Sequence, residues 1–429
     1  PAAERLLAQV GIRIPLGAGA SRTRLATQWM QMKLRGEKFV DRAVADIPAT
    51  ELLAVDVLYS IASGLAFADP ALGRVVQSEL MRAALDAGEP VRVCLALAQE
   101  VYYAAAGGSR NRTAVEGVAR RLDVLAKRIN HPHVTGIATL SIGLAAHMSG
   151  RWPEARTQLE AGLDTLREHG AGVRWELDMG ESYWLATLFY LGEWREMARL
   201  VQLHLRDAIE RGDGFAQQGL RTGRTNLAWL MVDRPDEAIE QLAIAVRWLG
   251  PSYSLSHAHT AMAHATVDLY RGDPTSAARR IEDALPRIEK LGLLRFQLPR
   301  IELTILRARI ALADQSRAVP DRASELRVLL DSLVNEGAAW VTGVAGLLRA
   351  AGLVMQDKYE LAIPVLDVAE LQLEAAGMPG YVHLARLRRG ELLGGPTGAA
   401  QAAAARDFLN DLGAVAPDRL AQLLVPWVA

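Results

Sequence analysis

The segment Tyr190-Leu191-Gly192-Glu193-Trp194-Arg195-Glu196 decides the fold, because it joins two long apolar stretches through a turn. A glycine readily adopts the left-handed backbone conformation that ends a helix. The acidic residues after the turn suit the positive end of a second helix. The same arrangement returns at Asp233-Arg234-Pro235-Asp236-Glu237, which begins 41 residues after Gly192. These two joints predict a chain built from repeated helix pairs.

Five such joints align without gaps along the chain. Their leading residues are Gly150, Gly192, Asp233, Gly272 and Asp357, which stand 42, 41, 39 and 85 residues apart. Because the last step is about two periods, we expect a further joint near Asp314, obscured by the insertion from Gln315 to Pro320. Apolar residues recur at three- and four-residue steps, and alternating strand patterns are sparse. The predicted fold is all-α: an α-solenoid of helix pairs with a period near 40 residues.

The regularity of these joints divides the chain into three predicted segments. Residues 1–148 form irregular helical repeats, 149–378 form regular repeats and 379–429 form capping helices, since the ends of such an array are atypical. The apolar run from Gly337 to Met355 is long enough to suggest a membrane span, but its small residues favour a buried repeat helix. The chain begins at Pro1 without a signal segment, and we expect it to be part of a larger protein.

The composition is that of a globular protein with balanced charge. Of the 429 residues, 23% are charged, with 48 Lys and Arg against 49 Asp and Glu. The formal net charge of −1 gives no global reason to expect nucleic acid or an anionic membrane as a partner. The single cysteine, Cys94, excludes an intrachain disulfide and favours a reducing compartment, so we expect a cytoplasmic protein.

The joints resemble those of tetratricopeptide repeats, in which a Leu-Gly turn precedes an aromatic residue by two positions and a small residue marks the helix crossing. Leu191-Gly192-Glu193-Trp194 and Gly150-Arg151-Trp152 carry this pattern, and Ala155 stands at the crossing. The chain departs from it in Met197 at one crossing and in its longer period. The resemblance implies a right-handed superhelix whose concave groove is lined by the first helix of each pair.

A second resemblance concerns the origin of the chain. The strings that carry it are Ile129-Asn130-His131-Pro132-His133, Gly172-Val173-Arg174-Trp175-Glu176-Leu177-Asp178, Thr225-Asn226-Leu227-Ala228-Trp229-Leu230 and Leu294-Arg295-Phe296-Gln297. In this order they resemble the C-terminal repeat region of multidomain bacterial serine/threonine kinases with a signalling-ATPase module, a type common in myxobacteria. This implies a sensor or scaffold that regulates an attached kinase and ATPase. The alternative is the inducer-sensing region of a multidomain transcriptional regulator.

No motif predicts catalysis, a cofactor or a metal. The chain has no Gly-x4-Gly-Lys-Ser/Thr, His-Arg-Asp, Asp-Phe-Gly or Gly-x-Ser-x-Gly sequence. His257, His259 and His264 form the only histidine cluster, and a metal there would need a further ligand from elsewhere. Glu176 and Asp178 are two apart, so on a helix they face different directions and do not predict acid–base chemistry. We therefore expect a binding protein and not an enzyme.

Counting back from each joint along the first helix of each pair identifies candidate groove residues. They are His147, Tyr183, Phe189, Arg221, Arg224 and His259, with Leu144, Leu227 and Leu230 on the same faces. Aromatic, basic and imidazole side chains together suit a peptide or an acidic ligand. The alternative for each residue is that it packs against neighbouring helices. Trp175, Trp184 and Trp229 are assigned to the core, because large aromatic rings bury much area.

The predicted partners follow from this groove and from the second resemblance. They are a protein or peptide, a small effector, or the attached kinase and ATPase modules. We expect no membrane and no direct contact with nucleic acid, and the oligomeric state is left open.

Overall fold

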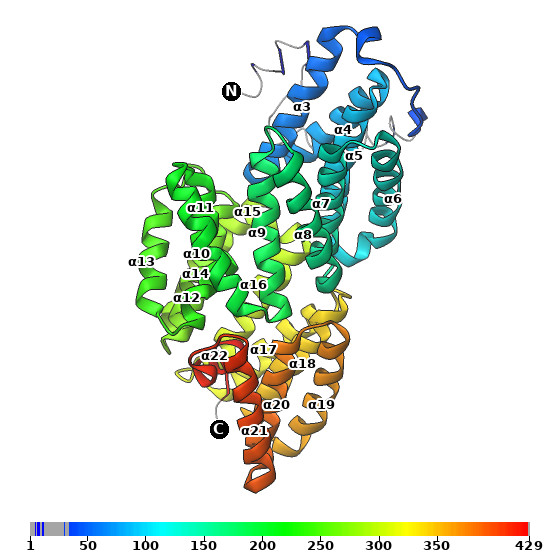
Figure 1. The fold of residues 1–429 in the computed structure, drawn as a ribbon. Helices are drawn as coiled ribbons and strands as arrows, with labels where there is room; N and C mark the ends of the chain where they lie inside the picture. The colour runs from blue at the N-terminus through cyan, green and yellow to red at the C-terminus, as the bar shows by residue number, and fades with distance from the viewer. Residues whose placement is uncertain (1–4, 6, 9–10, 13–29, 31–33, 428–429) are drawn as a thin grey trace. The chain divides into compact units, whose positions relative to one another are not determined.

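The computed structural model of the chain describes residues 5, 7, 8, 11, 12, 30 and 34–427. Throughout this part of the chain the regular elements are helices, and no strand occurs among the described residues (Figure 1). The first pairs are α3 (Ala49–Ala68) with α4 (Pro70–Ala87), α5 (Pro90–Ala105) with α6 (Arg112–Ile129), α7 (Pro132–Met148) with α8 (Trp152–His169), and α9 (Arg174–Leu191) with α10 (Trp194–Glu210). Short 3-10 turns, η1 (Val44–Asp46) and η2 (Gly108–Asn111), stand before α3 and α6.

The helix pairs continue to the C-terminal end. The next first helix is broken into α11 (Gly214–Arg221), η3 (Gly223–Asn226) and α12 (Leu227–Met231), and it precedes α13 (Pro235–Val246). Then follow α14 (Leu255–Tyr270) with α15 (Pro274–Leu291), η4 (Leu293–Arg295), α16 (Gln297–Ala313) with α17 (Val319–Val334), α18 (Ala339–Val354) with α19 (Tyr359–Ala375), α20 (Pro379–Leu393) with α21 (Gly395–Asp411), and α22 (Pro417–Leu424). Connections of a few residues make the two helices of a pair antiparallel. The prediction of an all-α chain of helix pairs is confirmed.

The contacts within the chain define two compact units. Unit 1 consists of Pro1–Ala146 and Thr157–Gly180, and unit 2 of His147–Arg156 and Glu181–Ala429. Helices α7, α8 and α9 contribute residues to both units. This division differs from the predicted segments 1–148, 149–378 and 379–429, which were drawn from the regularity of the repeats. Those segments remain a prediction. The right-handed sense of the array also remains a prediction.

All five leading residues of the aligned joints have the left-handed conformation. Their φ angles are 72° at Gly150, 75° at Gly192, 57° at Asp233, 79° at Gly272 and 60° at Asp357. Aspartate reaches this region more easily than most residues with a side chain. After Gly192, Asp233, Gly272 and Asp357 the next amide closes the turn: the Glu193 N–H, for example, donates to the Leu188 carbonyl at 2.9 Å, as in a Schellman cap. The turn chemistry read from the sequence is therefore confirmed.

The joint expected near Asp314 is present but has a different construction. Helix α16 ends at Ala313 and α17 begins at Val319. The φ angle of Asp314 is −77°, so this residue does not make the left-handed turn. Its carboxylate instead accepts hydrogen bonds from the Ser316 hydroxyl at 2.5 Å and the Ser316 amide at 3.2 Å. At this joint a turn held by the Asp314 side chain replaces the left-handed backbone turn of the other joints. The joint pattern is therefore obscured in the sequence here.

In unit 1, glycines let the helices of a pair approach closely. A Cβ atom on Gly143 of α7 would lie 2.8 Å from the backbone nitrogen of Leu159. One on Gly162 of α8 would lie 2.7 Å from the backbone nitrogen of Leu140. Because only glycine fits at these crossings, α7 and α8 are held with little freedom. Leu140 and Leu144 of α7 are thereby placed for the site described below.

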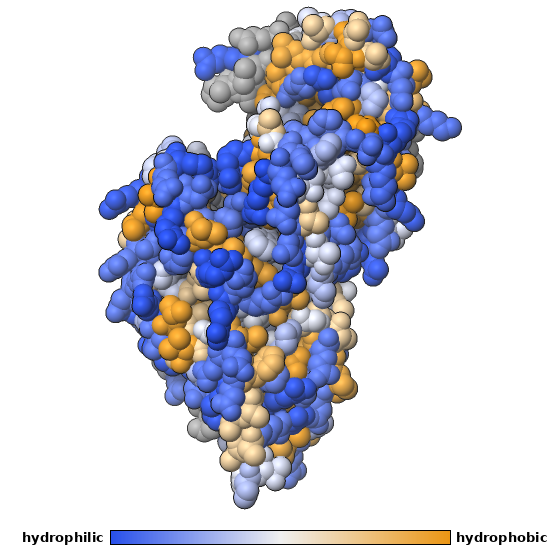
Figure 2. Space-filling view, in the orientation of Figure 1, coloured by the Kyte–Doolittle hydropathy of each residue, from blue (hydrophilic) through white to orange (hydrophobic). Residues whose placement is uncertain are grey.

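In unit 2, the core contains the predicted apolar helix and several tryptophans. Helix α18, within the run Gly337–Met355, is a buried repeat helix as predicted, with Trp340, Leu347 and Leu348 at most 3% exposed. Trp184 and Trp229 are also buried, as predicted. Hydrophilic residues cover most of the face drawn in Figure 2, with hydrophobic patches between them.

Helix α3 has a composition that the sequence prediction overlooked. Over Ala49–Ala66 this helix is long and apolar enough to cross a membrane, judged by length and composition alone, and it is the one such helix among the described residues. In the structure it packs against α4 and α5.

Candidate binding cleft

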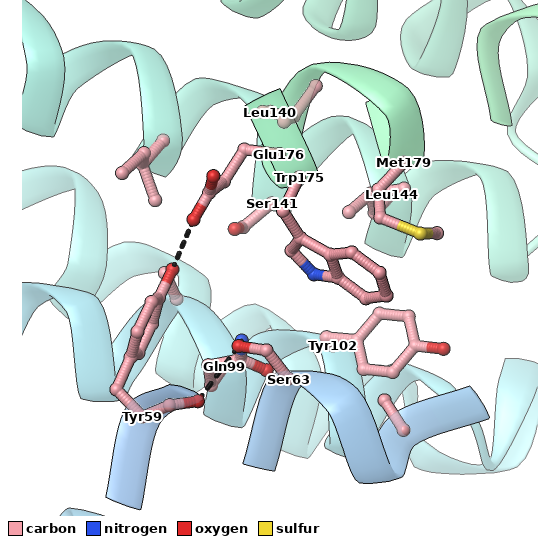
Figure 3. Close-up of a pocket in the computed structure, with 13 residues that line it drawn as sticks. Tyr59, Ser63, Gln99, Tyr102, Leu140, Ser141, Leu144, Trp175, Glu176 and Met179 are labelled. Atoms are coloured by element: carbon pink, nitrogen blue, oxygen red, sulfur yellow. Dashed lines mark hydrogen bonds between the residues drawn. The ribbon is translucent and has the colours of Figure 1, made fainter. Parts of the chain in front are cut away.

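A cleft in unit 1 is lined by the first helices of four consecutive pairs, α3, α5, α7 and α9. Its empty volume, part of which is open to solvent, is about 520 Å³ (Figure 3). The lining residues are Tyr59, Ser63 and Ala66 of α3; Ala98, Gln99 and Tyr102 of α5; Ile137, Leu140, Ser141 and Leu144 of α7; and Trp175, Glu176 and Met179 of α9. Steps of three and four residues place each group on one face of its helix.

The floor of the cleft is apolar. Ile137, Leu140 and Leu144 recur along α7 and are at most 7% exposed. Met179 from α9 and Ala98 from α5 are also buried. These side chains exclude water from one wall and provide a surface for an apolar part of a ligand.

Two hydrogen bonds across helices organise the polar side of the cleft. The Tyr59 hydroxyl donates to Oε1 of Glu176 at 3.0 Å, and Nε2 of Gln99 donates to the Ser63 hydroxyl at 2.5 Å (Figure 3). Burial, reinforced by the negative charge of Glu176, raises the pKa of Tyr59 well above its usual value of 10. Tyr59 therefore stays protonated and remains a donor to the carboxylate.

Two half-buried aromatic rings complete the lining. Trp175 and Tyr102 stand on the side of the cleft away from the Tyr59–Glu176 hydrogen bond in Figure 3. The assignment of Trp175 to the core was therefore wrong. Its indole stands on the first turn of α9 and contributes to the lining of the cleft.

None of the six predicted groove residues lines this cleft. His147 is fully buried in unit 2, where its Nδ1 lies 2.7 Å from the Thr187 hydroxyl and its ring is 5.2 Å from those of Trp152 and Tyr183. Burial, with a contribution from Arg224, lowers the pKa of His147 well below 6.5. The His147 imidazole is therefore neutral and occupies a core position.

Arg224 belongs to a charged cluster in unit 2. It forms an ion pair with Glu302, and its Nε donates to the Tyr190 hydroxyl at 3.0 Å. The Tyr190 hydroxyl donates in turn to Glu302, and the guanidinium carbon lies 5.3 Å from the centre of the Tyr190 ring. Phe189 is 4% exposed beside Tyr190, with ring centres 5.2 Å apart.

Three candidates remain, and the first of them, Tyr183, is half-buried with its ring beside that of His147. Arg221 is 4% exposed and donates to Oε1 of Gln241 at 2.9 Å and to the Gln217 carbonyl at 3.1 Å. His259 is half-buried, and burial, with a smaller effect of Arg224, lowers its pKa to about 4. His147, Phe189 and Arg221 are buried and pack against neighbouring helices, which is the alternative given for each candidate in the sequence analysis. Ligand binding by any of the six residues stays a prediction.

Sequence reasoning found part of this cleft and missed the rest. Leu144, predicted to face inward on α7, does line it. Tyr59, Gln99 and Tyr102 were missed because the irregular N-terminal pairs lack the joint pattern from which the faces were counted. The step from Tyr59 to Ser63 to Ala66 was a usable signal, since polar and small residues at this spacing interrupt an otherwise apolar helix.

The other residues that the sequence raised for chemistry are paired or buried in the part of the chain that the structure describes. No group of three or more His, Cys, Asp or Glu side chains that could hold a metal ion occurs among the described residues. Asp178, considered with Glu176, is 8% exposed and pairs with Arg174 at 2.5 Å. Burial raises the pKa of the Cys94 thiol to about 12, which makes it a poor nucleophile.

The comparisons with known proteins add little to these observations. No protein-family model matches the chain, and the comparison with curated proteins finds no match. Among solved structures, the chain is similar to the TPR domain of P58(IPK), at 14% sequence identity. The match covers 83% of this chain and 98% of that chain, with a TM-score of 0.20. A likeness at this TM-score supports no conclusion about the fold, and the assignment of helix pairs rests on the joints and helices described above.

Proposed function

We propose that this chain is a non-catalytic helical-repeat module that binds a peptide segment of a protein partner in the cleft between α3, α5, α7 and α9. The observation that carries the proposal is the lining itself. Four consecutive first helices bring an apolar floor, two half-buried aromatic rings and a hydrogen-bonded carboxylate to one place. Concave apolar sites with a few placed polar groups are where ligands bind, and half-exposed aromatic residues supply much of the binding energy.

The proposal extends to the larger protein. We propose that the module is a cytoplasmic sensor or scaffold that regulates an attached serine/threonine kinase and ATPase, on the basis of the four strings that resemble such proteins. The alternative is the inducer-sensing region of a transcriptional regulator. The reading frame on either side of residues 1–429 discriminates between them, because kinase motifs favour the first and a helix-turn-helix motif favours the second.

The binding proposal is tested with a displayed library of random dodecapeptides selected on the purified chain. We expect enriched peptides whose affinity falls about tenfold or more in the Trp175→Ala variant, because removing a large aromatic side chain from a binding site costs on the order of 1.4 kcal/mol or more. Fluorescence polarisation of the synthetic peptides measures the loss.

Trp248→Ala is the matched control, since Trp248 is 49% exposed in unit 2 and lines no part of the cleft. It should change the affinity less than about twofold. Enriched peptides that bind equally well to wild type and to Trp175→Ala would contradict the assignment of the cleft.

A further inference from the structure

The cleft has a single charged group in its lining. Of its thirteen lining residues, Glu176 is the one with a charged side chain, and no Lys, Arg or His is among them. Within the described part of the chain Glu176 takes part in no ion pair, and the hydrogen bond that it accepts from Tyr59 is made to Oε1. Oε2 is therefore available to a ligand, and the local charge is negative.

The aromatic rings of the cleft favour the same kind of ligand. The face of an aromatic ring carries partial negative charge and attracts a cation, most strongly in tryptophan. Trp175 and Tyr102 are both half-buried in the lining, where a bound group is partly desolvated. A carboxylate and two such rings in one cleft of about 520 Å³ together select a positively charged group over a neutral or negative one.

We propose that the cleft is specific for a basic side chain, an arginine or a lysine, on the bound peptide. The charged end pairs with Oε2 of Glu176 and lies against the rings of Trp175 and Tyr102, and the aliphatic stem packs on Leu140 and Leu144. A guanidinium suits this arrangement best, since it is planar and stacks on aromatic faces. The inference rests on the proposed function, and it concerns other residues than the groove for which the sequence suggested a peptide or an acidic ligand.

Glu176 also has a simpler role to consider. It stands in the first turn of α9, where a carboxylate is stabilised by the helix dipole, and its hydrogen bond with Tyr59 joins α9 to α3. If that were its whole role, replacing it would lower stability and leave the choice of ligand unchanged. Selectivity is therefore the quantity to measure.

The test uses fluorescein-labelled nonapeptides of glycine and serine that differ only in the central residue: arginine, lysine, citrulline or glutamate. Citrulline has the shape of arginine without its charge. With the complete chain we expect the arginine peptide to bind about tenfold more tightly than the citrulline peptide, by fluorescence polarisation, and the glutamate peptide more weakly still.

The isosteric variant Glu176→Gln should reduce the preference for arginine over citrulline to about twofold or less, with little change in the affinity for citrulline. Tyr59→Phe is the companion variant, because it removes the same hydrogen bond and keeps the carboxylate; it should retain the preference. Thermal unfolding of both variants shows whether they are folded. If Glu176→Gln is unstable, the comparison of the arginine and citrulline peptides on the wild-type chain still decides whether the cleft selects a positive charge.

The outcomes separate this inference from the proposed function. The inference is overturned if the arginine and citrulline peptides bind the wild-type chain equally, or if the arginine peptide does not bind at up to about 1 mM. In either case the library-selected peptides still test whether the cleft binds peptides. A preference for arginine that persists in folded Glu176→Gln overturns the role of Glu176. Peptide binding that is insensitive to Trp175→Ala overturns the proposed function itself.

Discussion

Arg224 is a candidate groove residue whose contacts show a structural role. Its guanidinium pairs with Glu302, donates to the Tyr190 hydroxyl and lies over the Tyr190 ring, so it neutralises a carboxylate inside unit 2. Arg221 is similarly committed, to Gln241 and Gln217. Reversing the charge of either arginine therefore disturbs the fold and cannot by itself report on ligand binding.

We expect Arg224→Met to lower the free energy of unfolding by about 2–3 kcal/mol, because it leaves Glu302 without its cation and removes a hydrogen bond to a charged group. Urea denaturation of the purified chain measures the change. The control is Arg199→Met, since Arg199 pairs with Glu196 on the exposed face of α10 and its replacement should leave the stability nearly unchanged. Equal costs for the two variants would contradict the structural role of Arg224.

At the scale of the element, the joint is the repeating feature, and in the five aligned joints its leading residue makes the turn between the two helices. The φ angles of all five aligned leading residues are positive, so glycine or aspartate stands there for a conformational reason. At Gly272 the space around an added Cβ atom is empty, so this position isolates the backbone effect from packing.

Gly272→Ala should lower the stability by about 1–2 kcal/mol, because alanine has to adopt a φ angle near 79°. Gly219 is the matched control: it lies inside α11, and its Cβ would also meet nothing within 4 Å. Gly219→Ala should raise the stability by about 0.5–1 kcal/mol, since alanine is the better helix former. The melting temperatures of both variants test this, and a shift of the same sign in both would refute the explanation.

At the scale of the whole molecule, a chain of helix pairs depends mainly on contacts between neighbouring pairs. Helices adjacent in sequence make most of these contacts, as between α18 and α19 and between α20 and α21. A substitution that disturbs one helix pair should therefore lower the hydrogen-exchange protection of the adjacent helices first and leave that of distant helices unchanged.

Gly390→Val tests this expectation at the crossing of α20 and α21. An added Cβ atom would lie 2.7 Å from the Gly398 carbonyl oxygen and 2.8 Å from the Ala402 nitrogen. Overpacking of this kind costs about 1–3 kcal/mol, so we expect hydrogen-exchange protection to fall about tenfold or more in α19 to α22 and to stay unchanged in α3 to α6.

The control for this change is Ala404→Val, because Ala404 is on the exposed face of α21. It should leave protection nearly unchanged throughout. Loss of protection in α3 to α6 equal to that in α20 and α21 would show that the chain unfolds as a single cooperative unit instead.

The sequence by itself determined the helices, the period and the joints. These depend on interactions within a few residues of Gly192 or Asp233: a left-handed backbone, a capping amide, an acidic first turn. The period located the joint near Asp314 correctly. The sequence did not predict how this joint is built, because the contacts of Ser316 with Asp314 have no distinctive sequence pattern.

Only the tertiary structure decided where the candidate cleft lies. The cleft brings Tyr59 to Glu176 across 117 residues, and no periodicity in the sequence relates the two. The tertiary structure also separated residues that line the cleft from residues that pack in the core, since burial depends on what the neighbouring helices cover. Trp175 and His147 show this most clearly: the indole expected in the core lines the cleft, and the imidazole expected at a surface is in the core.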